Sequence, residues 1–290
     1  MSAVAQLPNR RDEAWKYSDL RAALADDQVV LSEGRDVIER LAPGVQRMVI
    51  PAGETRLFVE RMDSPYRDAR SFEFTIEPGA TLTRVIVQDS TAFPLSMARV
   101  HVAAGARFTQ FVLAEGAKLA RIETHVGVEG EGAQVELNGV YLCDAGRHAD
   151  LTSVITHKTG GGVTRQLTKG VARKGGRGVF QGKIVVEHGA QKTDARQYHH
   201  GLLLEDGAEI FAKPELMIYA DDVQCAHGNT AGGLDESALF YMRSRGVPEA
   251  EARALLVEAF LVEAIPDGLP AELHAELLSR IQSWLRRRPS

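Results

Sequence analysis

The sequence predicts a mainly β protein, built on a β-solenoid core with helical regions at both ends. Three observations predict this fold. Apolar and polar residues alternate with period two through the middle of the chain, short Gly-Ala turn phrases recur there, and helical patterns occur only near the two ends. We therefore expect a stack of short strands flanked by a short N-terminal and a longer C-terminal helical region.

The period-two pattern runs from about residue 45 to residue 223. It is clearest in Phe72–Ile76, Val100–Val102 and Gln134–Leu137. Such alternation directs one set of side chains into a core and the other set outward. We therefore divide the chain into an N-terminal helical segment (1–44), a β core (45–223) and a C-terminal helical region (224–290).

The turn phrases place a glycine before an alanine at intervals along the β core. The first two intervals between these glycines are 26 and 27 residues, and the next are 57 and 18; the glycines are Gly79, Gly105, Gly132, Gly189 and Gly207. Glycine tolerates the positive φ that a tight corner needs. Short strands with corners at this spacing favour the coils of a solenoid, although a β-sandwich with Gly-Ala hairpins also fits.

The two ends carry helical patterns. Residues 11–41 have apolar positions three to five apart, and the final segment from Leu273 to Leu285 has a well-formed amphipathic face. Before it, an apolar stripe comprises Leu255, Leu256, Ala259 and Phe260. Packing against the end of the solenoid is the simpler interpretation of these stripes, and a partner-docking surface is the alternative.

Composition excludes several classes of protein. The 290 residues contain 34 Lys and Arg against 39 Asp and Glu, a net charge of −5, which does not indicate a nucleic-acid or acidic-membrane partner. The longest apolar run is interrupted by Glu258 and Glu263, so no membrane-spanning segment is expected. Two cysteines permit no disulfide framework, and no secretory signal is present, so we expect a cytoplasmic protein.

Nucleotide and nucleic-acid signals are weak. The glycine-rich stretch 175–184 fails the phosphate-loop pattern, because Arg177 replaces a required glycine and Ile184 replaces the Ser or Thr. Residues 158–192 hold eight basic residues against one acid, but Phe180 is their only aromatic neighbour. A solvated or partner-facing edge explains this basic stretch better than an RNA surface does.

Cys225 and His227 form the most chemically suggestive spot. Residues two apart on a strand share a face, so the thiol and the imidazole could reach one metal ion. A closed metal site needs about four ligands, and here the sequence offers two. A structural cysteine and histidine is the simpler interpretation. The alternative is an incomplete site finished by another chain, with His199 and His200 as further candidates.

The same region resembles the signature of a known family. Residues 220–235 read Ala-Asp-Asp-Val-Gln-Cys-Ala-His-Gly-Asn-Thr-Ala-Gly-Gly-Leu-Asp, and the match continues through Leu239–Gly246. This run resembles the SufB/SufD family, the scaffold subunits of the SUF iron–sulfur cluster assembly system. Three further phrases resemble the family: Val179–Ile184, Ala190–Ala195 and Lys213–Leu216. Two features resemble its SufD branch in particular, namely the phrase Glu13–Leu20 and the His227-Gly228 pair.

The resemblance implies a right-handed β-helix flanked by helices and a non-catalytic scaffold role. In the family, a SufB-type and a SufD-type subunit pair, and each binds a SufC-type ABC ATPase, which carries the ATP chemistry. The cluster assembles transiently where the two scaffolds meet, and the family's SufD histidine matches His227. We therefore expect His227, with Cys225 beside it, at a site shared with the SufB-type subunit. The isolated chain should hold no stable cofactor.

The resemblance also places the ATPase contact in the C-terminal helical region. Residues 235–267 carry seven acids and three bases, a local balance of −4. The residues expected to contact the SufC-type ATPase are Leu239, Phe240, Tyr241, Arg243, Arg245, Glu251, Leu255, Glu258 and Phe260. One departure from the family is Asn229, which stands where a small residue is more usual. The competing functions are a β-helix enzyme acting on carbohydrate and a stand-alone metal- or RNA-binding module.

Overall fold

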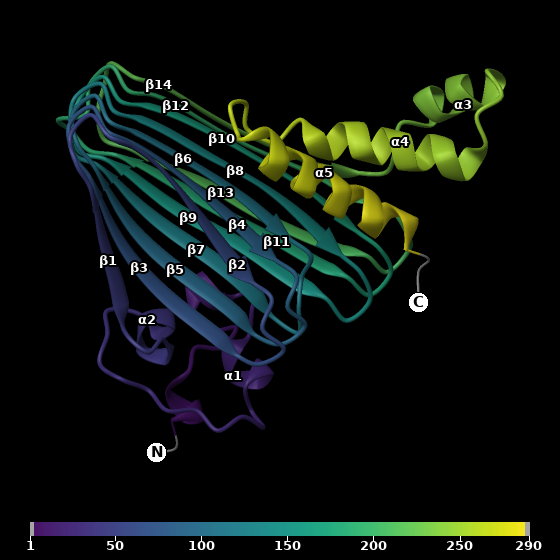
Figure 1. Cartoon of the computed structure of the whole chain (residues 1–290), viewed down its shortest axis with the longest axis horizontal. Coiled ribbons are helices and arrows are strands. Elements are labelled where there is room, and N and C mark those ends of the chain that lie inside the picture. The colour runs from purple at the N-terminus through teal and green to yellow at the C-terminus, as the bar shows by residue number, and fades with distance from the viewer. Residues whose placement is uncertain (1–2, 288–290) are drawn as a thin grey trace.

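The computed structural model describes residues 3–287, which form a parallel β-helix with helical segments on its two outer faces (Figure 1). The strands divide into two seven-stranded sheets. The odd-numbered strands follow one another from β1 to β13 in one sheet, and the even-numbered strands from β2 to β14 in the other. Every pair of neighbouring strands is parallel, which confirms the solenoid and excludes an antiparallel sandwich.

The chain visits the two sheets alternately, so each coil contributes one strand to each sheet. The odd-numbered sheet comprises β1 (Val45–Ile50), β3 (Asp68–Ile76), β5 (Pro94–Val102), β7 (Ala120–Val128), β9 (His148–His157), β11 (Arg177–Val186) and β13 (Glu209–Ile218). The even-numbered sheet comprises β2 (Thr55–Met62), β4 (Thr81–Gln88), β6 (Arg107–Ala114), β8 (Gln134–Cys143), β10 (Val163–Ala172), β12 (Asp194–Leu203) and β14 (Gln224–Gly232).

The coils lengthen along the chain. Val45 on β1 pairs with Ser71 on β3, 26 residues later, whereas Arg177 on β11 pairs with Glu209 on β13, 32 residues later. The strands grow from 6 residues in β1 to 10 residues in β13. The irregular glycine intervals of the sequence reflect this drift, because a corner shifts whenever a coil gains residues.

Most of the predicted corner glycines adopt the left-handed conformation. Four of them, Gly79, Gly105, Gly132 and Gly207, have φ between 62° and 83°. The prediction is wrong for Gly189, which is not among the residues with positive φ; at that corner Lys192 takes φ 60° instead. The Lys192 backbone N–H donates to the Asp222 carbonyl on the next coil at 2.5 Å, which offsets the cost of this conformation in a residue with a Cβ.

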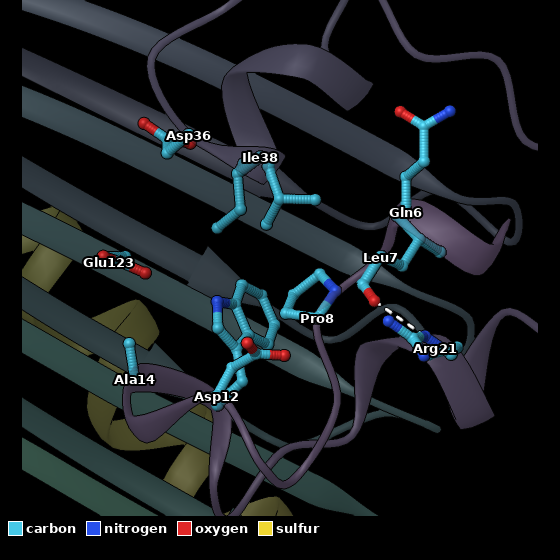
Figure 2. A pocket seen from close by; sticks show the side chains of 11 residues that line it. Gln6, Leu7, Pro8, Asp12, Ala14, Arg21, Asp36, Ile38 and Glu123 are labelled. Carbon is cyan, nitrogen blue, oxygen red and sulfur yellow. Dashed lines mark hydrogen bonds between the residues drawn. The ribbon is translucent and has the colours of Figure 1, made fainter. Parts of the chain in front are cut away.

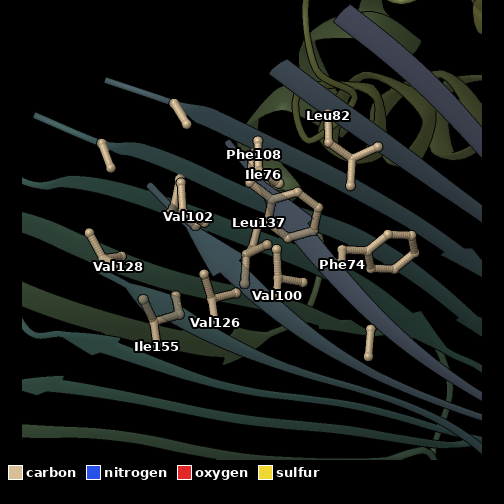
Figure 3. Close-up of a cluster of buried hydrophobic side chains, with 14 of the residues drawn as sticks. Phe74, Ile76, Leu82, Val100, Val102, Phe108, Val126, Val128, Leu137 and Ile155 are labelled. Atoms are coloured by element: carbon tan, nitrogen blue, oxygen red, sulfur yellow. The ribbon is translucent and has the colours of Figure 1, made fainter. Parts of the chain in front are cut away.

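The interior between the sheets is apolar at both ends of the strands and polar between them. One apolar cluster, drawn in part in Figure 3, includes Phe74, Leu82 and Phe108; the second includes Ile86, Val112 and Tyr141. Between these clusters the fully buried guanidinium of Arg84 donates to Glu60 at 2.5 Å and to Gln110 at 3.0 Å. The interior therefore contains a band of polar side chains that hydrogen-bond to one another, although Glu60 Oε1 and Arg84 Nε have no partner among residues 3–287.

The N-terminal segment covers the outer face of the odd-numbered sheet (Figure 1). Its elements are short: η1 (Val4–Gln6), η2 (Glu13–Trp15), α1 (Leu20–Ala23) and α2 (Val37–Leu41). The helical prediction for residues 11–41 is therefore only partly right. Leu7, Trp15, Leu20, Leu24 and Ile38 each lie against the sheet, and contact with that surface outweighs continuous helix formation.

The N-terminal sequence Glu13–Leu20 holds this segment in place. The Arg121 guanidinium lies 4.0 Å from the centre of the Trp15 ring, and the Tyr17 ring stacks on Phe211 of β13 at 5.2 Å. The Ser18 hydroxyl donates to the buried carboxylate of Asp150 at 2.5 Å. The residues Glu13–Leu20 thus contact odd-numbered strands from β7 to β13.

Three helices follow β14: α3 (Glu236–Ser244), α4 (Glu249–Val262) and α5 (Ala271–Arg286). Helix α5 buries one face, including Leu277, Ile281 and Trp284, against the outer face of the even-numbered sheet. The face packs on the chain as predicted, but on the flank of several coils rather than at the end of the solenoid. Arg173 stacks on the Trp284 ring at 4.0 Å and donates to the carbonyl of Leu285 at the helix C-terminus. Within residues 3–287, no helix has the length and hydropathy needed to cross a bilayer.

Buried histidines make the folded state sensitive to acid. Burial lowers the pKa of His157 to about 4, below the 6.5 of an unperturbed histidine, so the unfolded chain binds the proton more readily. The contribution of His157 is complete above about pH 6.5 and is lost as pH falls toward 4, by up to about 1.4 kcal/mol per pH unit. We predict that His157→Gln loses less stability than the wild type between about pH 7 and pH 5 in urea denaturation. The exposed His274→Gln is the control, and an unchanged slope for His157→Gln would contradict the assignment.

Candidate functional site

Cys225 and His227 lie on the last strand of the β-helix. The period-two pattern predicts a β core that ends at residue 223, whereas the structure continues it through β14 to Gly232. Strand β14 pairs with β12 along one edge, and its other edge has no neighbouring strand among residues 3–287 (Figure 1). The candidate site is therefore the exposed end of the coil stack rather than the start of the helical region.

The pairing register shows which side chains of β14 face the interior. Cys225 pairs with Ala195 and packs against the first apolar cluster, so its side chain points inward and is half-buried. By alternation, His227 and Asn229 share that inward face, and both are exposed because no further coil covers them in the described part of the chain. The end of the β-helix therefore presents a thiol, an imidazole and a carboxamide side by side.

The residue paired with His227 on the coil beneath is Gln197. Its side chain is fully buried, and its Nε2 donates to the carbonyl of Gly182 at 3.1 Å. Its Oε1 has no hydrogen-bond partner among residues 3–287. A buried acceptor that lacks a donor is costly, so the layer beneath His227 retains hydrogen-bonding capacity that the described residues do not use.

His199 lies beneath Asn229 and connects it to the interior. Its Nδ1 is 2.7 Å from the Asn229 Oδ1, and its Nε2 is 2.9 Å from the Tyr141 hydroxyl. Burial lowers the pKa of His199 to about 4, even though the Asn229 hydrogen bond raises it. His200, the other histidine suggested by the sequence, lies on the opposite face and contacts Thr230 at 2.7 Å. The structure thus brings His199 to the site through Asn229 and separates His200 from it.

The two thiols differ in accessibility. Cys143 is fully buried, and burial raises its pKa to about 12. Burial also raises the pKa of Cys225, which is half-buried at the end coil. Within residues 3–287, no three His, Cys, Asp or Glu side chains are grouped to hold a metal ion. A four-coordinate ion at Cys225 and His227 would need further donors from outside this part of the chain.

Within the described part of the chain, five of the eight basic residues in the stretch 158–192 form ion pairs, four with acids on neighbouring coils and one with an acid at the end of α4. Lys158 pairs with Glu129 at 2.8 Å, and Arg165 pairs with Asp194 at 2.5 Å. Lys169, Arg173 and Arg177 also form ion pairs, with Glu263, Asp144 and Glu209 respectively. Paired charges attract a polyanion less than free ones, so the structure gives the RNA-surface interpretation no support.

The expected ATPase contacts divide into exposed and buried residues. Phe240 and Tyr241 of α3 and Leu255 of α4 are 72%, 59% and 45% exposed, whereas Leu239 is 2% exposed and holds α3 in place. The face that α4 buries is not the predicted stripe but a set offset from it: Ala252, Val257 and Leu261. Large exposed apolar side chains therefore lie on both α3 and α4, two helices that contact each other.

The remaining residues expected to contact the ATPase differ in how far other residues of the chain already engage them. Glu251 is exposed, and Arg243 pairs with Glu249 at 3.4 Å. Arg245 lies 5.2 Å from the Tyr241 ring centre. Two residues are engaged internally: Lys169 covers the Phe260 ring at 4.4 Å, and Glu258 accepts a hydrogen bond from Gln282 at 2.8 Å.

A separate pocket of about 390 Å³ lies under the N-terminal segment (Figure 2). Leu7, Pro8 and Ile38 supply its apolar wall, and Arg21 donates to the Leu7 carbonyl at 2.8 Å. Two of its acidic groups already have cationic partners: Glu123 pairs with Arg121 at 2.8 Å, and Asp36 pairs with Arg99. The third, Asp12, accepts a backbone hydrogen bond from Asn9 at 2.8 Å. The acidic side chains of the pocket are therefore engaged within the chain, and the end coil remains the candidate site.

Comparison with known proteins places this arrangement in a family. The family model described as "SUF system FeS cluster assembly, SufBD core domain" matches residues 47–260, which include the β-helix, α3 and most of α4. The chain belongs to the SufBD family. This confirms the resemblance carried by the sequence around Cys225 and His227, and the SufBD core match includes the whole of the last coil.

Individual relatives agree with this membership. The chain is 36% identical over 183 residues to the iron–sulfur cluster assembly protein SufD of Escherichia coli, covering 62% of this chain and 43% of that protein. It is 32% identical over 208 residues to a SufBD family protein of Synechocystis, covering 71% and 46%. A SufBD family protein of Mycobacterium leprae is 28% identical over 252 residues, covering 83% and 64%. The chain thus matches less than half of the first two SufBD relatives.

The difference between the thiols can be tested chemically. We predict that Ellman's reagent modifies Cys225 in the native SufBD chain and reaches Cys143 only after denaturation, because Cys143 is fully buried. Reaction at Cys225 should be slower than that of a free thiol at about pH 8, since its raised pKa reduces the thiolate fraction. Cys225→Ser should abolish the native reaction. Two equally reactive thiols in the folded protein would contradict this arrangement.

Proposed function

We propose that this SufBD chain is a non-catalytic, cytoplasmic scaffold subunit of the SUF system. It pairs with a SufB-type subunit through the end of its β-helix, and an iron–sulfur cluster assembles there as cargo. The observation that carries this proposal is the exposure of Cys225 and His227 on an unpaired edge strand. Two donors on one face form part of a site, and a second chain can supply the rest.

The end coil supports pairing by its backbone as well as by its side chains. An unpaired strand edge exposes N–H and C=O groups that readily accept another strand. Apolar side chains accompany this edge: Met217, Ile218 and Tyr219, at and just after the end of β13, are 37%, 42% and 47% exposed. A partner that extends the sheets would cover both the backbone groups and these side chains.

The opposite end of the β-helix is closed differently. Phe58 on the first coil packs edge-to-face on Phe72 at 5.3 Å and on Phe74 at 5.6 Å. These rings fill the interior at that end, and Glu60 beside them is already bonded to Arg84. In the described part of the chain, the inward face of the first coil thus presents aromatic rings and a carboxylate that Arg84 already engages, which favours the last coil as the shared site.

The exposed side chains of α3 and α4 support a second contact, with a SufC-type ATPase. Phe240, Tyr241 and Leu255 provide apolar anchors, and Glu251 is an exposed acid of the same helix as Leu255. Such a combination matches the usual division of an interface, in which buried aromatic groups provide affinity and rim charges guide association. ATP hydrolysis in the complex is assigned to that partner.

The cluster site is tested by substitution within the assembled complex. We predict that His227→Ala abolishes cluster formation while the subunits still co-purify, because the imidazole is a ligand rather than a packing group. Cys225→Ala should reduce cluster formation less, because the family resemblance assigns the main thiolate to the SufB-type subunit. Iron and acid-labile sulfide per complex, together with the visible spectrum, measure both effects.

A control for this experiment lies on the same strand. Thr230→Ala alters the opposite face of β14 and should leave cluster content unchanged. A His227→Ala complex with the wild-type iron and sulfide content would overturn the proposed site.

The ATPase contact is tested with aromatic substitutions. We predict that Phe240→Ser combined with Tyr241→Ser weakens binding of the SufC-type subunit at least about tenfold, since exposed aromatic anchors often contribute ~2 kcal/mol or more. Isothermal titration calorimetry measures the affinity. Leu57→Ser is the control, because it removes another exposed apolar side chain, 45% exposed, on the first coil and away from α3 and α4. Unchanged affinity in a folded double variant would move the docking site elsewhere.

A further inference from the structure

Asn229 is held in one orientation by a chain of hydrogen bonds that begins inside the β-helix. Its Oδ1 lies 2.7 Å from the His199 Nδ1. A carboxamide oxygen can only accept, so Nδ1 carries the proton. The His199 Nε2 must then accept, and it does so from the Tyr141 hydroxyl at 2.9 Å. Each hydrogen bond in this chain therefore has a defined donor: Tyr141 donates to His199, and His199 donates to Asn229 at the end coil.

The middle member of this chain is firmly held. The fully buried ring of His199 stacks on Phe180 at 5.1 Å and 10°, and on Tyr141 at 5.9 Å and 14°. Burial keeps the pKa of His199 at about 4, so the ring is neutral near pH 7 and carries a single N–H, as the hydrogen bonds require. Because the ring cannot turn between its neighbours, it fixes the carboxamide of Asn229.

With its oxygen engaged, Asn229 presents its Nδ2 group at the open end. These two N–H groups have no hydrogen-bond partner among residues 3–287, and the side chain is exposed. Residues two apart on a strand lie roughly 7 Å from each other on one face, so the donors stand beside His227. Oriented N–H donors next to an imidazole suit an anionic ligand, and sulfur atoms of iron–sulfur clusters accept such hydrogen bonds.

We propose that Asn229 donates hydrogen bonds from Nδ2 to a sulfur atom of the cluster held at His227. The role of Asn229 rests on the proposed function, and it explains why a polar residue stands where the family more usually has a small one. Reduction adds negative charge to the cluster sulfurs, so donors stabilise the reduced form more than the oxidised form. Asn229 therefore raises the reduction potential and slows loss of the cluster.

The test uses the complex assembled with the SufB-type and SufC-type subunits. Asn229→Ala should lower the midpoint reduction potential and speed removal of the cluster by a chelator about tenfold, the effect of losing one hydrogen bond to a charged group. Asn229→Asp keeps the shape but replaces the donors with a negatively charged acceptor that repels the anionic cluster, so it should have a larger effect than Asn229→Ala. Thr230→Ala, on the opposite face of the same strand, should match the wild type.

A second variant tests whether the Asn229 carboxamide must be held in its orientation or need only be present. His199→Phe removes the bond that fixes Asn229, and it should shift the potential in the same direction as Asn229→Ala. Equal potentials, visible circular dichroism and chelator half-lives for Asn229→Ala and the wild type would overturn the role of Asn229. If His227→Ala still removes the cluster in that case, the proposed function holds and only the role of Asn229 is rejected. If His227→Ala retains the cluster, the site and the role of Asn229 both fail.

Discussion

A parallel coil stack cannot satisfy its own backbone at the ends, and this constraint governs the rest of the molecule. Each strand bonds to the coils before and after it, so the first and last coils each leave one edge unpaired. At the first coil, aromatic rings fill the interior. At the last coil, the interior ends in polar side chains. The unpaired edge of β14 there coincides with the candidate site.

Much of the fold could be predicted from the sequence because its signals are local. Strand alternation such as Phe72–Ile76 and the amphipathic face of α5 repeat over many residues, and both are present in the structure. The corner at Gly189 and the helices expected in residues 11–41 depend instead on contacts with distant coils. Asp222 supports Lys192 at that corner, and the outer face of the sheet holds the N-terminal segment.

The candidate site shows the same limit. Cys225 and His227 could be found because they are close in the sequence and lie in a long family-like run. The chain from Tyr141 through His199 to Asn229 could not, because its members are 58 and 30 residues apart and meet only through the coil register. The buried face of α4 could not be predicted, because a short apolar stripe does not reveal which side of the helix contacts the sheet.

Helix α5 changes how a coil stack can unfold. Stacked repeats touch only their neighbours and tend to fray one at a time. Here α5 lies across Val85, Phe111, Val140 and Val171 on four successive even-numbered strands, and Glu276 and Arg280 bind Arg61 and Asp89 near the first coils. These coils are thereby joined into one cooperative unit. The last even-numbered strand lies beyond that clamp, so local opening is concentrated where a partner would dock.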